Sequence, residues 1–457
     1  MPQRLECYPL IYHPDPLAYF AQLRHRPGAV LLDSGRPGTQ GGQYDIMSSD
    51  PLALLTTDQD GTVNCDEYPD LPQHPIDAQR DLLAQLDVTP PETSLPFTAG
   101  LMGFWSYDFG RVLEPLPTHA IADIDLPLSR LGLYDWSIVQ DHQQRTCWLL
   151  ATPPRRKQVL NWLARCPLED RPFSLTSPFQ STITRAEYGQ RFRQIQHYIH
   201  SGDCYQVNFA QRFSAPYKGD LWLAYQALRE ATPTPFAAFM AWRGASGHEH
   251  GVVSLSPERF LRINHGEILT QPIKGTRPRG VTPALDMQLS QDLQHSTKDL
   301  AENVMIVDLL RNDIGRVAMP GSVRVPAFAK LESYANVHHL VSTVTGTLAE
   351  EHHVLEALAA AFPGGSITGA PKIRAMQIID ELEPFQRSLY CGSVGYIDIR
   401  GHMDTSIAIR TAVASQGQLH LWGGGGIVAD SNEQAEFDET LAKIGRLMAV
   451  LEKTEGH

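Results

Sequence analysis

The sequence contains 457 residues, of which 42% are hydrophobic and 19% are charged, a balance typical of globular proteins. Its formal net charge is −13, and its basic residues form no extended run. An acidic chain without a basic stripe is a poor match for a nucleic-acid-binding protein. If the protein binds an anionic small molecule, a few cations must therefore be gathered locally in a cleft.

The six cysteines are widely separated and form no CxxC or CxxH pattern, so neither a zinc site nor a disulfide framework is indicated. The first residues lack the apolar segment of a secretory signal, and no apolar run approaches the ~20 residues that a membrane span needs. We therefore expect a soluble cytoplasmic protein that has neither a membrane nor a nucleic acid as its partner.

Short strand-like runs alternate with turns rich in Pro, Gly and Asp through residues 1–150, which predicts antiparallel sheet. Four of these runs are residues 29–32, 104–107, 131–139 and 147–150, and the glycine-rich residues 35–42 predict a mobile loop. A Ser/Thr-rich stretch at residues 174–184 indicates a soft boundary between two regions. Beyond it, helices and strands mix without a βαβ rhythm, so the predicted fold class is α+β.

A helix is predicted to start just after this boundary. Thr184 can cap it, and Glu187 stands three positions later, where it completes a capping box. Apolar residues at helical spacing continue to residue 199, and a Ser-Gly-Asp sequence then ends the helix. The following strand is predicted at residues 205–213.

Residues 271–279 read QPIKGTRPR and place Lys274 in a Pro/Gly-punctuated turn after a strand-like run. Alone, this stretch is typical of a basic hairpin turn. Glu258, in the sequence SPERF, and His339, in a His-His pair, are likewise more often structural than functional when each is considered alone.

Two predicted helices carry carboxylates with a potential chemical role. Residues 299–313 are apolar almost all round and predict a buried helix. On it, Glu302 is either an exposed first-turn residue or a metal ligand or acid that faces a cleft. Glu436, Glu439 and Lys443 share one face of the last helix. Such a face is usually solvated, but two glutamates one turn apart and a third from another helix would suit Mg²⁺.

Glycine-rich residues 363–372 are similar to a phosphate loop, but Ala370 and Pro371 stand where a Walker sequence has Lys and Ser or Thr. This difference excludes a nucleotide site, although backbone N–H groups there could still bind a carboxylate. Four glycines at residues 423–426 indicate either a flexible connector or a close approach of the backbone to a ligand. Arg410 lies in a strand-like stretch and is either a surface residue or a bidentate carboxylate ligand.

Together, motifs in a fixed order over residues 184–450 resemble the chorismate-utilising enzymes. Those motifs are the segment ending in Gln206, SPERF, PIKGT, AENVMIVDLLRNDIGRV, VHHLVSTV, PGGSITGAPKIRAM, GSVGYI, MDTSIAIRT, GGGGIVADS and EFDETLAK. Residues 1–175 are similar to the N-terminal region of the amine-forming members. The resemblance implies a large α+β fold of the anthranilate synthase component I type, with two antiparallel-sheet subdomains, helices outside and a cleft active site.

The resemblance also implies chorismate as the substrate and Mg²⁺ as the cofactor. It implies Glu302, Glu439 and Glu436 as the metal ligands. The residues that it implies as substrate-binding are Arg410, Lys443, Gly426, Ser366, Gln206 and Thr276.

In the implied reaction, Lys274 attacks ring carbon C2, Glu258 protonates the leaving 4-hydroxyl, and His339 orients groups or shares a proton. Ammonia, supplied by a small glutamine amidotransferase subunit, then adds at C4. Gln206 replaces the lysine base of the water-using members and so favours ammonia. Lys274 favours 4-amino-4-deoxychorismate, the precursor of 4-aminobenzoate and folate. The sequence GTRPRG, which contains Arg277, instead favours the members that release pyruvate and form anthranilate.

The resemblance further implies a tryptophan pocket near Ser34, with Pro235 and Phe236 as a second wall. We expect this pocket to be structural or vestigial. A non-catalytic protein that senses tryptophan or chorismate remains a competing hypothesis, but it predicts an eroded active site, and every expected position is filled.

Overall fold

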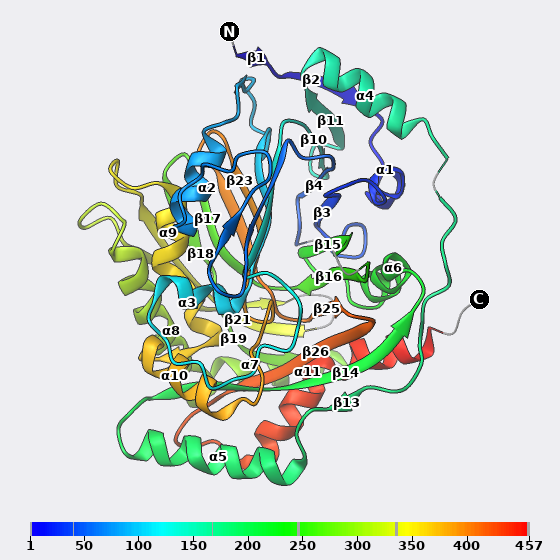
Figure 1. Ribbon diagram of the computed structural model, residues 1–457. Helices are drawn as coiled ribbons and strands as arrows, with labels where there is room; N and C mark the ends of the chain where they lie inside the picture. The colour runs from blue at the N-terminus through cyan, green and yellow to red at the C-terminus, as the bar shows by residue number, and fades with distance from the viewer. Residues whose placement is uncertain (1, 40, 167, 245–246, 334–336, 455–457) are drawn as a thin grey trace.

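The computed structural model describes residues 2–39, 41–166, 168–244, 247–333 and 337–454. Two large, mainly antiparallel sheets form its centre, and most helices lie at the periphery (Figure 1). The α+β class predicted from the sequence is confirmed. Of the loop predicted at residues 35–42, residue 40 lies outside the described residues. No helix in the described ranges is long and apolar enough to cross a membrane.

The first sheet has, in spatial order, β12 (Ser174–Leu175), β14 (Gln206–Lys218), β26 (Gln418–Ile427), β25 (Thr411–Ser415), β16 (Glu249–Ser256), β15 (Phe236–Arg243), β3 (Val30–Asp33), β4 (Tyr44–Ser48), β10 (Ser137–Asp141), β11 (Thr146–Ala151) and β2 (Glu6–Leu10). Two short strands, β13 (Gln180–Ser181) and β22 (Gly369–Ala370), also pair with β14.

The second sheet has, in order, β19 (Ile273–Pro278), β21 (Val337–Thr347), β18 (Glu267–Thr270), β17 (Arg259–Asn264), β24 (Met403–Ile407), β23 (Ser393–Asp398), β8 (Gly100–Trp105), β9 (Ser129–Tyr134), β5 (Ala53–Thr57) and β6 (Val63–Asn64). In addition, β20 (Arg324–Ser333) pairs with β21. A separate parallel pair joins β1 (Gln3–Arg4) to β7 (Val88–Thr89).

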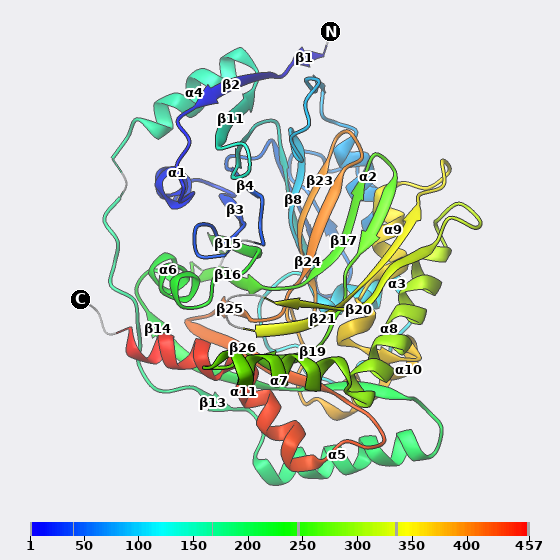
Figure 2. The same cartoon turned by 180° about the vertical axis from the view of Figure 1, so that it is seen from behind.

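The helices are α1 (Leu17–Leu23), α2 (Pro75–Leu83), α3 (Gly110–Leu113), α4 (Pro153–Leu163), α5 (Arg185–His200), α6 (Leu221–Ala231), α7 (Pro283–Gln294), α8 (Thr297–Gly315), α9 (Val354–Ala361), α10 (Lys372–Leu382) and α11 (Glu433–Lys453). Two short 3₁₀ helices are η1 (Tyr107–Phe109) and η2 (Gly365–Ile367). From behind, α7 and α8 lie beside β19, β20 and β21, and α11 lies against β26 (Figure 2).

The capping box predicted for α5 is confirmed. The Thr184 hydroxyl accepts a hydrogen bond from the Glu187 amide at 3.2 Å, and the Glu187 carboxylate accepts one from the Thr184 amide at 2.7 Å. Tyr188, Phe192 and Ile195 are buried along one face of the helix. Helix α5 therefore starts where local sequence chemistry satisfies its first free amides.

Both sheets contain strands from both ends of the chain. Strand β3 pairs with β15, and β8 pairs with β23. The predicted run at residues 131–139 is in fact two strands, β9 and β10, which belong to different sheets. The division into regions 1–175 and 184–450 stays a prediction, and the two regions share both sheets.

Helix α8 corrects the expectation of burial almost all round. Its buried residues, among them Ile306 and Leu310, lie on one face of the helix. Val304, in contrast, is 57% exposed. The high apolar content of this segment suggested a fully buried helix, but the helix covers the edge of the second sheet and has one open side. Asp308 and Arg311 form an exposed ion pair of 3.1 Å near its end.

Candidate active site

Lys274 lies on edge strand β19 and not in the tight turn that its Pro and Gly neighbours suggested. The pairing with β21 shifts register between Lys274 and Thr276, and Gly275 between them has a φ of +78°. Residues with a Cβ rarely adopt this conformation, so the bulge depends on glycine. From this bulge, Nζ of Lys274 donates a hydrogen bond to the carbonyl oxygen of Ser366 at 2.8 Å.

Ser366 also contacts the carboxyl group of Glu258. Its hydroxyl donates to Oε1 of Glu258 at 2.8 Å, and Glu258 is only 5% exposed. Burial raises the pKa of Glu258, although the Ser366 hydrogen bond and the Lys274 ammonium group oppose this effect. A carboxyl group with a raised pKa keeps its proton to higher pH, as a general acid must.

Thr276 and His339 face each other across β19 and β21. The Thr276 hydroxyl and Nδ1 of His339 share a hydrogen bond of 2.9 Å. Burial lowers the pKa of His339 to about 4, and the nearby Arg410 guanidinium adds to the shift. The ring is therefore neutral at physiological pH and can accept or donate a hydrogen bond. The neighbouring His338 instead contacts Asp286 at 3.0 Å.

Arg410 lies between β24 and β25, so its placement within a strand was wrong. Its φ is +51°, which turns the chain between the two sheets. Within the described residues its guanidinium makes no hydrogen bond, ion pair or ring contact, and burial lowers its pKa. A partly buried cation without a partner is costly, and a bound anion would remove that cost.

Glu436, Glu439 and Lys443 lie on one face of α11, at the spacing that the sequence indicated. Oε1 of Glu439 pairs with Lys443 at 2.6 Å, and Oε1 of Glu436 pairs with Lys298 at 3.1 Å. Burial opposes ionisation of Glu439, but the ammonium groups of Lys443, Lys298 and Lys274 together outweigh it and lower the pKa of Glu439. Glu436 is only 3% exposed, so this face is not an ordinary solvated one.

Glu302 is partly buried on α8. Burial raises the pKa of Glu302, and the ammonium groups of Lys274 and Lys298 both oppose the rise. Glu302 lies in the second turn of α8, beyond the first turn, and its carboxylate is within electrostatic reach of both lysines. Through Glu302, Lys274 on β19 is connected electrostatically to Glu436 on α11.

The four glycines at residues 423–426 belong to β26, so a flexible connector is excluded. A Cβ at Gly426 would lie 2.2 Å from Nε2 of Gln206, and one at Gly425 would lie 3.2 Å from Glu436 Oε2 and 3.3 Å from Glu439 Oε1. The absence of side chains thus leaves room for both groups. Gln206 is fully buried, and its amide oxygen and nitrogen both lack a hydrogen-bond partner among the described residues.

The three glutamates match Mg²⁺ in the type of their donor atoms, because this ion prefers carboxylate oxygens and keeps several waters. Two of these carboxylates also converge against the backbone of Gly425. However, no three His, Cys, Asp or Glu side chains in the described ranges already form a metal-binding group. Lysine ammonium groups pair with two of the three carboxylates instead.

These contacts link the residues predicted for the reaction into one candidate site. Lys298 and Asn303 are additional residues of this site that sequence reasoning missed. The Asn303 side-chain amide lies 3.5 Å from the carbonyl oxygen of Lys274, and its oxygen accepts from Ser342 at 2.9 Å. The four-residue spacing between Lys298 and Glu302 on a predicted helix was the signal that could have identified Lys298.

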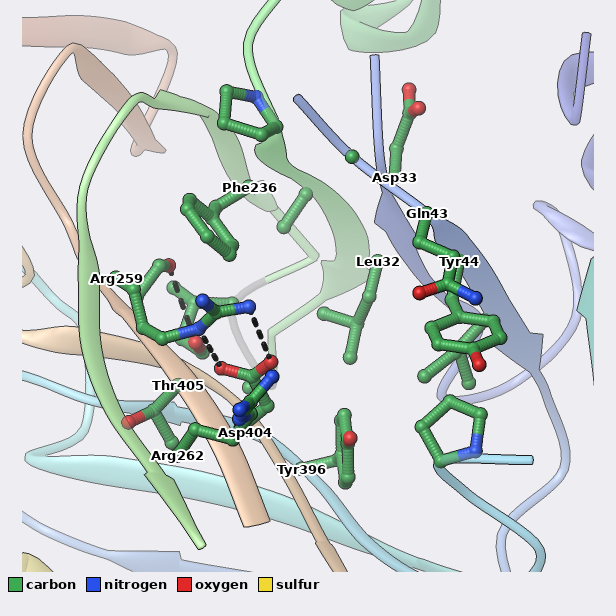
Figure 3. Close-up of a pocket in the computed structure, with 18 of the residues that line it drawn as sticks. Leu32, Asp33, Gln43, Tyr44, Phe236, Arg259, Arg262, Tyr396, Asp404 and Thr405 are labelled. Atoms are coloured by element: carbon green, nitrogen blue, oxygen red, sulfur yellow. Dashed lines mark hydrogen bonds and ion pairs between the residues drawn. The ribbon is translucent and has the colours of Figure 1, made fainter. Parts of the chain in front are cut away.

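A separate cavity of about 440 Å³ lies between the two sheets (Figure 3). Leu32 and Tyr44 form one wall, and Arg259 and Asp404 lie on the opposite wall. Nε of Arg259 pairs with Oδ1 of Asp404 at 2.9 Å, and the guanidinium carbon lies 4.8 Å from the centre of the Phe236 ring. None of the active-site side chains described above lines this cavity.

Two of the three residues predicted for a tryptophan pocket, Pro235 and Phe236, line this cavity. Ser34 does not, because it is buried and its hydroxyl donates to Asp45 at 2.6 Å. Its neighbour Asp33 does belong to the lining.

The family model described as chorismate binding enzyme matches residues 29–449, and the chain belongs to this family of enzymes. It is 49% identical to aminodeoxychorismate synthase component 1 of Salmonella typhimurium over 442 residues, which cover 95% of each chain. Its identity to the protein of the same name from Escherichia coli is 48% over 440 residues, which cover 95% of this chain and 96% of that one.

More distant relatives include anthranilate synthase component 1 of Geobacillus stearothermophilus, with 32% identity over 96% of this chain and 92% of that one. Among solved structures, anthranilate synthase component I from Streptococcus pneumoniae superimposes with a TM-score of 0.78 at 29% identity, covering 89% of this chain and 92% of that one. The menaquinone-specific isochorismate synthase of Escherichia coli shares the fold, with a TM-score of 0.74 at 19% identity, covering 99% of this chain and 96% of that one.

Proposed function

We propose that the chain is the chorismate-binding component of an aminodeoxychorismate synthase. It would convert chorismate and ammonia to 4-amino-4-deoxychorismate, for 4-aminobenzoate and folate synthesis. The observation that carries the proposal is the position of Ser366, whose carbonyl oxygen holds the amine of Lys274 and whose hydroxyl holds the carboxyl of Glu258. Lys274 as nucleophile and Glu258 as acid are thus both bound to Ser366. This arrangement suits a substitution in which the nucleophile adds to the ring while the acid protonates the leaving group.

In the first step, Lys274 reacts as the free amine while Glu258 holds the proton, and the lysine nitrogen forms a bond to ring carbon C2. The ring double bonds shift, the C4–oxygen bond breaks, and Glu258 gives its proton to the leaving hydroxyl, which departs as water. In the second step, ammonia bonds to C4, the double bonds shift back, and the Lys274 amine leaves C2. The Glu258 carboxylate accepts the surplus proton from the added ammonia, so the enzyme returns to its initial state.

The two substrate carboxylates require cations, and Arg410 supports this assignment because it has no partner among the described residues. We assign it to one carboxylate, with Lys443 and the backbone around Gly426 and Ser366 as further contacts. The neutral His339, held by Thr276, would orient the amine or share its proton. These groups hold the substrate where attack on C2 and departure from C4 can occur together.

Glu302, Glu436 and Glu439 would hold Mg²⁺ in the working enzyme. When bound, the ion would neutralise the ring carboxylate and polarise the diene. The carboxylate character of all three donors and the room above Gly425 support this assignment. The proton transfers and the attack on C2 described above are carried out by side chains of the protein.

Ammonia would come from glutamine through a separate amidotransferase subunit, so we propose a heterodimer that works in the cytoplasm. The component 1 names of the relatives support a second component. Free ammonium at alkaline pH would replace it in the isolated chain. Gln206, buried with both amide atoms unsatisfied in the described structure, would contact the substrate or the incoming ammonia.

Anthranilate synthesis is the second candidate, favoured by the GTRPRG sequence. The side chains of that sequence have structural partners, which weakens this argument. Arg277 pairs with Asp299 at 3.1 Å, and Arg279 pairs with Asp286 at 2.8 Å. Arg277 thus links β19 to α8, and Arg279, just after β19, links the chain to α7. This structural role is compatible with either product.

Mass spectrometry of the products formed from chorismate, MgCl₂ and ¹⁵N-ammonium at alkaline pH tests the proposal. The expected product retains the enolpyruvyl group and contains one ¹⁵N. Labelled anthranilate together with pyruvate would instead establish the second candidate. Absence of any labelled product, with intact chorismate and a folded protein, would leave the non-catalytic alternative.

The cavity between the sheets is our candidate for a structural tryptophan pocket. Its Phe236 and Tyr44 rings and the neighbouring polar groups support an aromatic amino acid as the occupant. Equilibrium dialysis of the folded protein, after unfolding and refolding to release any bound ligand, tests this proposal. If the protein binds no more tryptophan than a control protein that has no tryptophan site, the proposal is refuted.

A further inference from the structure

Lys298 lies at the carboxylate cluster but has no place in the reaction described above. It is the second residue of α8, and its Nζ is 3.1 Å from Oε1 of Glu436. The two side chains differ in exposure, with 45% for Lys298 and 3% for Glu436. A flexible, half-exposed ammonium group thus neutralises a carboxylate that is almost completely buried.

The position of Lys298 on its helix makes this contact informative. The first turn of a helix carries a partial positive charge, so an ammonium group there is unfavourable unless a nearby anion compensates. Helix α8 already has Ser296 as its N-cap and Asp299 in the first turn, which suffice to start it. Lys298 is therefore held in place by the carboxylates opposite and not by the needs of its own helix.

All three proposed metal ligands act on Lys298. Its ammonium group is paired with Glu436 at 3.1 Å, and the carboxylates of Glu302 and Glu439 also attract it electrostatically. A cation attracted by three carboxylates lies in the region where a divalent ion would be bound.

We propose that Lys298 is an internal counter-cation that holds the Glu436 carboxylate when no metal is bound and must leave it when a divalent cation binds. The inference rests on the magnesium site of the proposed function. The long aliphatic stem and the solvent on one side give the ammonium group a route to water without movement of α8. Lys298 therefore keeps the empty site stable and weakens its affinity for the ion.

The test is the affinity of the substrate-free protein for MgCl₂, measured by isothermal titration calorimetry on Lys298→Met, Lys298→Arg and the wild type. Because Lys298→Met removes the competing cation, we expect Mg²⁺ to bind about tenfold more tightly, the effect of one charge-assisted hydrogen bond. Lys298→Arg keeps a cation and should bind no more tightly than the wild type. Lys157→Met removes one lysine charge from an exposed position on α4 and is the matched control.

A second measurement, thermal unfolding with and without MgCl₂, separates competition from a structural role. Lys298→Met should unfold at a lower temperature than the wild type without metal, because the buried Glu436 carboxylate loses its cation. Added Mg²⁺ should raise the unfolding temperature of Lys298→Met more than that of the wild type. If Lys298→Met does not fold without metal, its refolding on addition of MgCl₂ is the corresponding expected result.

The outcomes distinguish this inference from the proposed metal site. If the wild type and Lys298→Met both bind no Mg²⁺, the magnesium site itself is wrong. If both bind it with equal affinity, or if Lys298→Met binds it more weakly, the site stands and the counter-cation is refuted. Tighter binding by Lys157→Met would show that only the overall charge matters, which also refutes it.

Discussion

Arg410 offers a sharp test of how the site recognises its substrate. We expect Arg410→Gln to raise KM for chorismate and to leave the unfolding temperature unchanged or slightly higher. The reason is the same in both cases: the guanidinium has no partner within the described protein, and burial lowers its pKa. Removing it therefore breaks no internal contact, whereas it removes a cation from the substrate.

The magnitude follows from the kind of bond lost. A hydrogen bond to a charged group contributes about 1.5–3 kcal/mol. At about 1.4 kcal/mol per tenfold change, this corresponds to a roughly 10- to 150-fold loss in kcat/KM, carried mainly by KM. Arg410→Lys keeps the charge but loses the planar fork, so its loss should be intermediate.

Arg212→Gln is the matched control, because this arginine is also buried but is already paired. It binds Asp123 through two hydrogen bonds of 2.7 and 2.6 Å. Its replacement should lower the unfolding temperature by a few degrees and leave KM unchanged. Steady-state kinetics with ammonium and a thermal melt would measure both variants. A destabilised Arg410→Gln with a wild-type KM would refute the assignment of Arg410 to the substrate.

Two further predictions concern the proposed chemistry. Lys274→Ala should abolish any covalent adduct detected by intact-protein mass spectrometry and reduce the ammonia-dependent rate by at least ~10²-fold; a rate within about threefold of wild type would exclude covalent catalysis. Burial raises the pKa of Glu258 above its usual 4.5, so the folded state retains this proton to higher pH and loses stability as the pH rises from 4.5 through the raised pKa. Glu258→Gln lacks this pH-dependent loss, so in urea titrations its stability relative to the wild type should increase between pH 4 and neutrality. Its activity should disappear. A stability difference that does not depend on pH would contradict the raised pKa.

Features set by neighbouring residues could be predicted from the sequence. The start of α5 depends on Thr184 and Glu187, three positions apart, and the common face of Glu436 and Glu439 follows from helical spacing. Arg410 was placed wrongly because a left-handed residue between two strands leaves no signal in the hydrophobic pattern.

Other features depend on contacts between distant parts of the chain. The contact between Lys298 and Glu436 joins residues 138 positions apart, and no local periodicity encodes it. The glycines of β26 were open to two interpretations, since a run of glycines is typical both of flexible connectors and of places where the backbone closely approaches a ligand. Their pairing within β26 excludes the connector, and the position of Gln206 against Gly426 shows which group occupies the space. The family motifs named residues on both helices, α8 and α11, although their individual roles stay a prediction.

The sharing of both sheets has a consequence for synthesis of the chain. Strand β8 pairs with β23 through Phe104 and Val394, so the centre of the second sheet cannot close until both have left the ribosome. The two residues are 290 positions apart, and at roughly 5–20 residues per second this length takes roughly 15–60 s to translate. During that time β8 has an unpaired apolar edge, which is prone to aggregation. The nascent protein therefore depends on protection of its first strands, and fragments cut near residue 180 should be poorly soluble when expressed alone.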